Sequence, residues 1–149
     1  MRDHIRKYLI VAATFNKNVT DGLLAGARRA LSEAKVKESE IKVVRVPGTW
    51  EIPFATNWFA GGDRPCAIIA LGAVIKHETS HDYWINHAVF PRLQQIAEDQ
   101  MVPLTLGIIT CDSEKQALAR SRADKENRGY VAAKAAVEMV QLLAHGDKM

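Results

Sequence analysis

The chain has 149 residues, a net charge of +3 and ordinary proportions of hydrophobic (48%) and charged (25%) residues. This length is close to the commonest domain size, so we expect one domain over residues 1–149. No apolar run approaches the roughly 20 residues of a membrane span, and residues 1–7 show no signal-peptide cleavage site. The basic residues are scattered rather than gathered into a nucleic-acid-binding patch. These features predict a cytoplasmic protein that binds neither membranes nor nucleic acids.

Hydrophobic periodicity predicts strands that alternate with helices. Short apolar runs are typical of strands, whereas apolar residues three and four positions apart are typical of helices packed on a core. In chain order, the pattern predicts a strand at 7–13, a helix at 20–34, a strand at 41–46, a helix at 50–60, a strand at 66–74, a helix at 82–100, a strand at 103–110, a short helix after 113 and a helix at 131–143. Ser113 and Gln116 resemble a capping box, and Pro91 is expected to kink the helix that contains it.

This alternation predicts an α/β fold, a flavodoxin-like three-layer α/β/α sandwich with a four-stranded parallel sheet and right-handed crossovers. Ligands of such sheets bind at the carboxyl ends of the strands. The loops that follow the first three strands, at 14–19, 46–51 and 75–81, are therefore the expected site.

The first two loops carry side chains that suit an aromatic ligand. Phe15 follows a strand directly, where its ring can stack on a planar ligand or close the edge of the core. Thr49, Trp50 and Glu51 lie where a turn enters a helix. The indole and the carboxylate suit a polyhydroxylated aromatic ligand, although core packing and helix capping explain them equally well.

The third loop contains His77, Glu78 and His81 in the H-E-x-x-H spacing of zinc proteases, and His87 falls at the third ligand position of the extended signature. Trp84 replaces the glycine that lets the chain turn toward the metal, and the motif begins directly after a strand. A zinc hydrolase is therefore an alternative, and a site without metal is preferred.

A phosphate-binding loop is the preferred interpretation of this segment. An imidazole, as at His81, is the side chain most often used for proton transfer, and Thr79 lies at a helix start that suits an anion. Arg120 and Arg128 flank a short polar loop, and a guanidinium binds phosphate in bidentate fashion.

Several dispersed segments, taken together, resemble the lumazine synthase family through residue 143. They are ATFN at 13–16, LLAGA at 23–27, VPGTWEIP at 46–53, ALGAVIK at 70–76, ETSH at 78–81, QALAR at 116–120, NRG at 127–129 and AAKAAVEM at 132–139. The resemblance implies a single lumazine-synthase-like domain. It also implies a transferase of riboflavin biosynthesis that condenses 5-amino-6-(D-ribitylamino)uracil with 3,4-dihydroxy-2-butanone 4-phosphate to 6,7-dimethyl-8-ribityllumazine, without cofactor or metal.

The resemblance also implies roles for individual residues. His81 would shuttle protons, and Arg120 of a neighbouring subunit would hold the phosphate. The complete implied substrate-binding set is Phe15, Thr49, Trp50, Glu51, Ala73, Val74, Ile75, Glu78, Thr79, Leu106, Arg120 and Arg128.

Three positions depart from the family pattern. His77 stands where the family usually has glycine, Leu106 where many members have an aromatic ring, and Arg128 where lysine is common. His77 and Leu106 leave a non-catalytic flavin- or lumazine-binding paralogue as an alternative. The resemblance implies a homopentamer, and the family's capsid-associated stretch is absent from 120–129, which favours a free pentamer or a pair of pentamers.

Overall fold

The computed structural model describes residues 6–146. The N-terminal residues 1–5, on which the absence of a signal peptide was predicted, lie outside the described part. Four strands form one sheet in the order β2-β1-β3-β4, and every neighbouring pair is parallel. The strands are β1 (Tyr8–Ala13), β2 (Ile41–Val46), β3 (Ala67–Ile75) and β4 (Leu104–Cys111).

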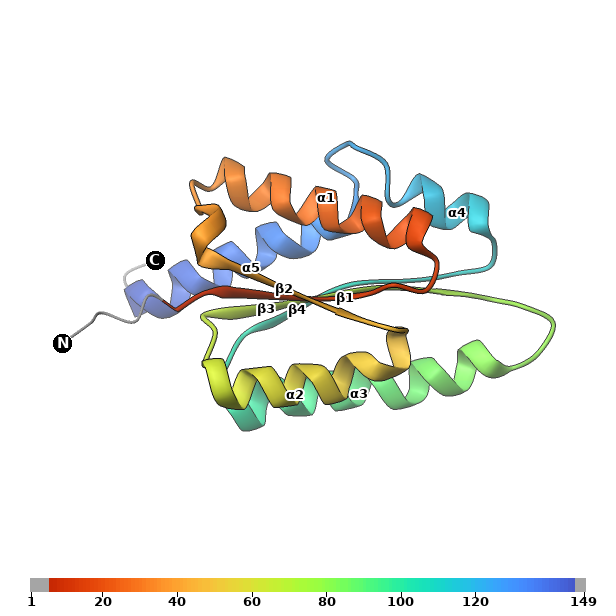
Figure 1. Cartoon of the computed structure of the whole chain (residues 1–149), viewed down its shortest axis with the longest axis horizontal. Helices are drawn as coiled ribbons and strands as arrows, with labels where there is room; N and C mark the ends of the chain where they lie inside the picture. Colours follow the sequence, from red (N-terminus) through yellow and green to blue (C-terminus); the bar gives the residue numbers. More distant parts are fainter. Residues whose placement is uncertain (1–5, 147–149) are drawn as a thin grey trace.

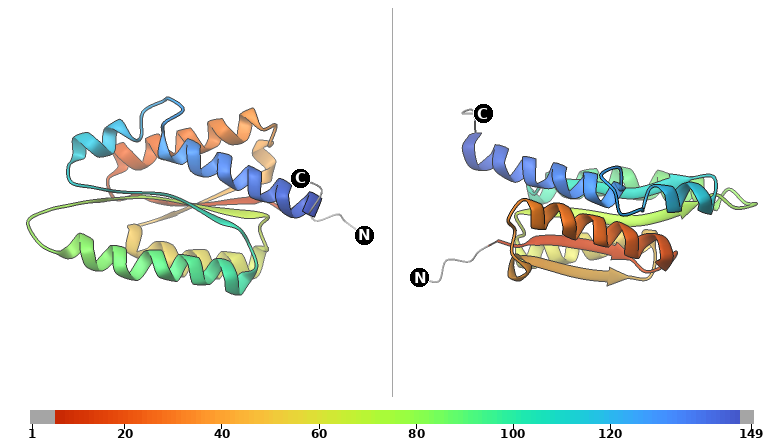
Figure 2. Two further views of the ribbon diagram at one scale, coloured as in Figure 1. Left: turned by 180° about the vertical axis from the view of Figure 1, so that it is seen from behind. Right: turned by 90° about the horizontal axis from the view of Figure 1, so that it is seen from above.

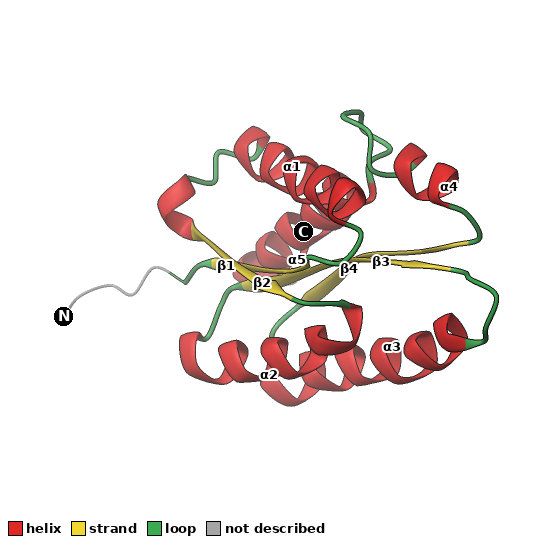
Figure 3. Cartoon of the chain, turned by 45° about the vertical axis from the view of Figure 1, so that its right-hand side comes forward, coloured by secondary structure: helices red, strands yellow, loops and turns green. Residues whose placement is uncertain are grey.

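The helices cover both faces of the sheet, which confirms the predicted three-layer α/β/α sandwich. Helices α1, α4 and α5 lie on one face, and α2 and α3 lie on the other (Figure 1, Figure 3). Their bounds are α1 (Lys17–Glu33), α2 (Ile52–Asp63), α3 (His81–Gln100), α4 (Glu114–Ala119) and α5 (Arg128–His145). None of the helices in the described part is long and apolar enough to cross a membrane.

Each face of the sheet has its own hydrophobic core because side chains alternate along the central strands. Ile10 of β1 packs in the cluster under α1 and α5, whereas Leu9 and Val11 pack in the cluster under α2 and α3. All six residues of β1 are buried. The central strands therefore form a rigid base for the loops at their ends.

Two helix predictions are refined by the structure. Helix α3 contains Pro91 and runs through it, and the kink expected there stays a prediction. The Ser113 hydroxyl accepts from the Gln116 amide at 3.2 Å, as in a capping box. The reciprocal bond is shifted by one residue, because the Gln116 side chain accepts from the Asp112 N–H at 2.9 Å.

Both cysteines are free thiols and partly buried. Burial raises the pKa of the Cys66 thiol to about 11. Burial also raises the pKa of Cys111, and the nearby Arg120 opposes that shift. Both thiols are therefore protonated at neutral pH and are poor nucleophiles.

Helices α1 and α5 lie side by side on one face of the sheet (Figure 2). Their contact is so close that a Cβ at Gly129 would overlap the backbone carbonyl of Leu23, and one at Gly26 would overlap the Asn127 side chain. Two sequence segments of the family pattern, 23–27 and 127–129, thus meet in space. Glycine is required at both positions because any side chain would separate the helices.

Asn127 holds this contact with four hydrogen bonds and is completely buried. Its Oδ1 caps α5 by accepting from the N–H groups of Gly129 and Tyr130 at 2.9 and 3.0 Å. Its Nδ2 donates to the carbonyls of Gly22 in α1 and Arg122 at 3.0 and 2.8 Å. One amide therefore fastens the 120–128 segment to both helices.

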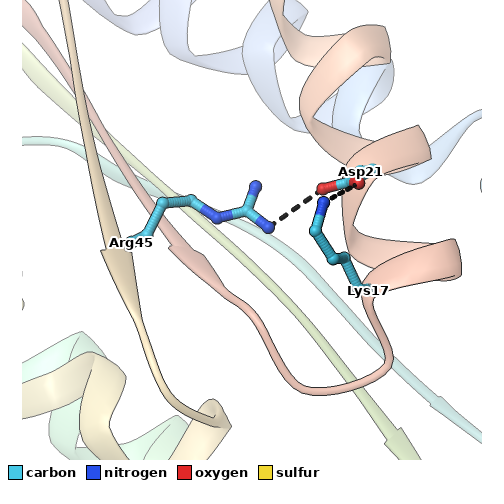
Figure 4. A network of polar contacts seen from close by, with 3 residues as sticks. All are labelled: Lys17, Asp21 and Arg45. Atoms are coloured by element: carbon cyan, nitrogen blue, oxygen red, sulfur yellow. Dashed lines mark hydrogen bonds and ion pairs between the residues drawn. The ribbon is translucent and has the colours of Figure 1, made fainter.

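A salt-bridge network joins the first turn of α1 to the end of β2 (Figure 4). Asp21 accepts from Lys17 in its own helix and from Arg45 of β2, the latter at 2.9 Å. The hydrogen bond from Lys17 and then that from Arg45 lower the pKa of Asp21 below its ordinary value of 3.8. The network therefore favours the charged carboxylate and fixes β2 beside α1.

We expect Gly129→Ala to lower the free energy of unfolding by about 1–3 kcal/mol or more, because the new methyl group overpacks the α1–α5 contact. Gly62→Ala is the matched control, since a Cβ at Gly62 of α2 meets no atom within 4 Å. Alanine should stabilise that helix by roughly 0.5 kcal/mol. Urea denaturation of both variants measures the difference, and equal stabilities would contradict the packing argument.

Asp21→Asn should lower the free energy of unfolding near neutral pH. The pKa of Asp21 is lower in the folded protein than the unfolded value of 3.8, so its charged carboxylate stabilises the folded state above that pH. This stabilisation is lost as the pH falls through the folded pKa. The difference from wild type should therefore vanish in acid and shrink in high salt. Urea titrations across pH test this, with Asp99→Asn as the control because Asp99 accepts only from the neutral Gln95 amide. A pH-independent difference would contradict it.

Candidate active site

A cavity of about 320 Å³ opens at the carboxyl ends of β1, β2 and β3. The strand order places β2 on one side of β1 and β3 on the other, which makes this edge the switch point of the topology. All three suspected loops contribute to the cavity. Its lining comprises Phe15, Asn16, Pro47, Gly48, Thr49, Trp50, Glu51, Ala73, Val74, Ile75, His77, His81, Asp82 and Ile85.

The first two loops continue the pairing of β1 with β2. The Thr14 N–H donates to the Val46 carbonyl at 2.7 Å, and the Phe15 N–H donates to the Pro47 carbonyl at 2.8 Å. The Phe15 side chain is 66% exposed beside the cavity. This exposure contradicts the core-edge explanation of Phe15 and leaves its ring free to contact a ligand.

The loop after β2 lies directly on β3. Thr49 is buried, and a Cβ at Gly72 of β3 would lie 2.7 Å from its hydroxyl. Trp50 is 60% exposed, so core packing does not explain it. Residues 49–51 form a short 3-10 turn before α2, and Glu51 makes no side-chain cap hydrogen bond to that helix. Its carboxylate is available to the cavity.

The third loop brings a different set of residues to the cavity than the sequence predicted. Ala73, Val74 and Ile75 at the end of β3 line it, as do His77 and His81. Glu78 and Thr79 lie outside the lining, in the exposed part of the loop. The Thr79 hydroxyl instead accepts from the His81 N–H at 3.4 Å, at the start of α3.

Several lining residues were absent from the predicted substrate-binding set. Asn16, Pro47 and Gly48 lie inside the loops that were predicted to form the site, so their positions in those loops could have identified them. Asp82 and Ile85 lie in the first turns of α3. The position of Asp82 directly after His81 was its sequence signal, whereas Ile85 carried no separate signal.

The zinc signature lacks its structural context. Helix α3 begins at His81, so His77 lies outside the helix and the two imidazoles do not share a helical turn. The His87 ring lies against Tyr83, with ring centroids 3.9 Å apart. Within residues 6–146, no group of three or more histidine, cysteine, aspartate or glutamate side chains is placed to hold a metal ion.

The remaining predicted residues lie away from this cavity. Arg120 and Arg128 line a separate hollow with Lys125 and Glu126 between α4 and α5. The Arg128 N–H donates to the Arg120 carbonyl at 2.8 Å, which keeps the two together. Leu106, 45% exposed, lies on the edge strand β4. The cavity lining itself contains neither lysine nor arginine.

Comparison with known proteins gives a consistent result. The family model of 6,7-dimethyl-8-ribityllumazine synthase matches residues 6–144. A protein of that name from Xanthomonas campestris pv. campestris (strain B100) is 36% identical over 143 residues, covering 96% of this chain and 93% of the relative. One from Coxiella burnetii (strain Dugway 5J108-111) is 39% identical over 137 residues, covering 92% and 91%. The chain therefore belongs to the 6,7-dimethyl-8-ribityllumazine synthase family.

Proposed function

We propose that the chain condenses 5-amino-6-(D-ribitylamino)uracil with 3,4-dihydroxy-2-butanone 4-phosphate to 6,7-dimethyl-8-ribityllumazine, as the transferase of this riboflavin step. Family membership supports this reaction. The observation that carries it in the structure is the convergence of Phe15, Glu51 and His81 from three loops on one cavity. An aromatic surface, a carboxylate and an imidazole are the groups that this pair of substrates requires.

The ring half of the site consists of Phe15, Thr49, Trp50, Glu51 and the strand end 73–75. The pyrimidine ring stacks on the exposed Phe15 side chain. The Glu51 carboxylate accepts hydrogen bonds from ribityl hydroxyls, and the backbone at 73–75 offers donors and acceptors to the polar edge of the ring. Holding the ring amine beside the ketone lowers the entropic barrier to their reaction.

The phosphate half begins with His81. Its imidazole takes a proton as the amine attacks the ketone and returns it to the oxygen that leaves as water. It then takes a proton from the carbon beside the new imine as the C–O bond to phosphate breaks. The segment of Glu78 and Thr79 follows His77 directly and binds the butanone phosphate, although neither residue lines the cavity of the single chain. His77 supplies a second imidazole in the lining. None of these groups is a fixed cation, so this half is incomplete within one chain.

Arg120 and Arg128 of a neighbouring subunit complete the phosphate half in a homopentamer. Phe54 and Trp58 of α2 are exposed and stack with ring centroids 6.3 Å apart, and Trp84 of α3 is exposed as well. Exposed Leu106 and Val131 lie on other elements, β4 and α5. Two different complementary surfaces make a head-to-tail contact, which closes into a ring. Three further expectations stay predictions. They are the cytoplasmic location, the extent of the domain and the choice between a free pentamer and a pair of pentamers.

An assay with both substrates tests the reaction, because the lumazine product has its own absorbance. We expect product formation that survives a chelator.

His81→Ala should lower kcat about 100-fold or more. Arg120→Ala should raise KM for the butanone phosphate about 10- to 100-fold. Arg28→Ala is the control, since Arg28 pairs with Glu38 outside both hollows. Tight flavin binding without product would favour the non-catalytic paralogue, and loss of activity with chelator would favour zinc.

Mixed assemblies test whether neighbouring chains share the site. His81→Ala and Arg120→Ala chains, each impaired alone, are unfolded together and refolded in equal amounts. A random ring should regain about one quarter of wild-type activity, because one quarter of its sites pair an intact His81 with an intact Arg120. A native mass of five 16.5 kDa chains is expected. No recovery in correctly assembled rings would place both residues in a single-chain site.

A further inference from the structure

Asn16 has an unusual backbone conformation at the edge of the cavity. It is the N-cap residue of α1 with φ 60° and ψ 51°, in the left-handed region. Its carbonyl accepts from the N–H groups of Val19 and Thr20 at 2.9 and 3.0 Å, which starts the helix. Asparagine is among the few residues that tolerate this conformation. The backbone at Asn16 therefore turns sharply, directly after the exposed Phe15.

The Asn16 side chain does not serve the helix that it begins. Asparagine is favoured at N-caps because its side-chain oxygen accepts from the first free N–H groups of the helix, but Asn16 makes no such bond. Asn127 and Ser113, in contrast, cap α5 and α4 with their side chains. Asn16 Nδ2 instead donates to the Ala73 carbonyl at 3.2 Å. The amide is thus used at the site and not in the helix.

Ala73 lies beyond the part of β3 that pairs with β1, although it still pairs with Ile109 of β4. The β1–β3 ladder ends at the pair Ala12 and Leu71, while β3 continues to Ile75. Because backbone groups alternate between the two sides of a strand, the Ala73 carbonyl points toward β1, beyond the end of that ladder. The Asn16 amide takes the place of the missing strand and ties the Phe15 loop to the end of β3.

We infer that Asn16 is a positioning residue for the ring half of the site, holding Phe15 at a fixed distance from the backbone edge at 73–75 through its bond to the Ala73 carbonyl. A substrate ring that stacks on Phe15 and also bonds to the backbone at 73–75 needs these two surfaces at a fixed spacing. The hydrogen bond from Asn16 to Ala73 fixes that spacing before the substrate binds. The inference rests on the proposed function of this cavity.

Two substitutions separate the side chain of Asn16 from its backbone. Asn16→Gly keeps the left-handed conformation freely but removes the amide. Asn16→Asp keeps the size and replaces the donor with an oxygen that faces the Ala73 carbonyl. Asn18→Asp is the matched control, because Asn18 lies on the same helix and bonds to Glu114, away from the cavity.

The steady-state constants are measured for each substrate in the assembled enzyme, with thermal unfolding of every variant. We expect both Asn16 variants to raise KM for the ribitylaminouracil about tenfold, the effect of one lost hydrogen bond. KM for the butanone phosphate and kcat should stay within about threefold of wild type, and Asn18→Asp should match wild type. If Asn16→Asp unfolds, Asn16→Gly alone carries the test.

Three results would overturn the inference. Wild-type kinetics for Asn16→Gly would leave Asn16 with a backbone role only. An equal rise in both KM values, or the same rise in Asn18→Asp, would indicate a general loss of order. Phe15→Ala is measured in parallel: if it is impaired while the Asn16 variants are normal, the ring half stands and only the role of Asn16 fails. Absence of product from wild type would instead contradict the proposed function.

Discussion

The order of the parallel sheet is the constraint on which the site depends. Since β1 lies between β2 and β3, the chain ends that leave these three strands meet at one edge. The loops are then joined by a hydrogen bond from the Phe15 N–H to the Pro47 carbonyl and by packing of the Thr49 side chain against Gly72 of β3. An exposed aromatic ring and a carboxylate are thereby held on a rigid base, and little loop entropy remains to be lost when a ligand binds.

The close contact between α1 and α5 has a second consequence for the site. Asn127 holds the 120–128 segment against α1, and this segment carries Arg120 and Arg128 into a hollow away from the cavity. The same bonds that stabilise the fold thus keep the fixed cations apart from the imidazoles of their own chain. This placement supports the proposal that these cations act on the cavity of a neighbouring copy.

Much of the fold was predictable because apolar periodicity reports burial directly. Within residues 6–146, every strand and α-helix was predicted, although α1 and α5 begin three residues before their predicted starts. Side-chain partners were less predictable. The pattern around Gln116 suggested a bond to Ser113 N–H, but the glutamine bonds one residue earlier. Asn16 could be placed in a loop, yet its bond to Ala73 spans 57 residues, and local sequence contains no signal for such a partner. The H-E-x-x-H spacing has the same limit, because spacing alone does not say where α3 begins.

Division of the site between two chains fits the chemistry of the proposed reaction. An amine and a ketone condense readily once they are aligned, so the ring half needs orientation and not charge. Departure of phosphate, in contrast, builds negative charge that a cation stabilises best when it is fixed in advance. A ring half within one chain supplies the first requirement through Phe15 and the end of β3. In the proposed assembly, arginines held by Asn127 on the next chain supply the second requirement, so the proposal makes turnover dependent on assembly.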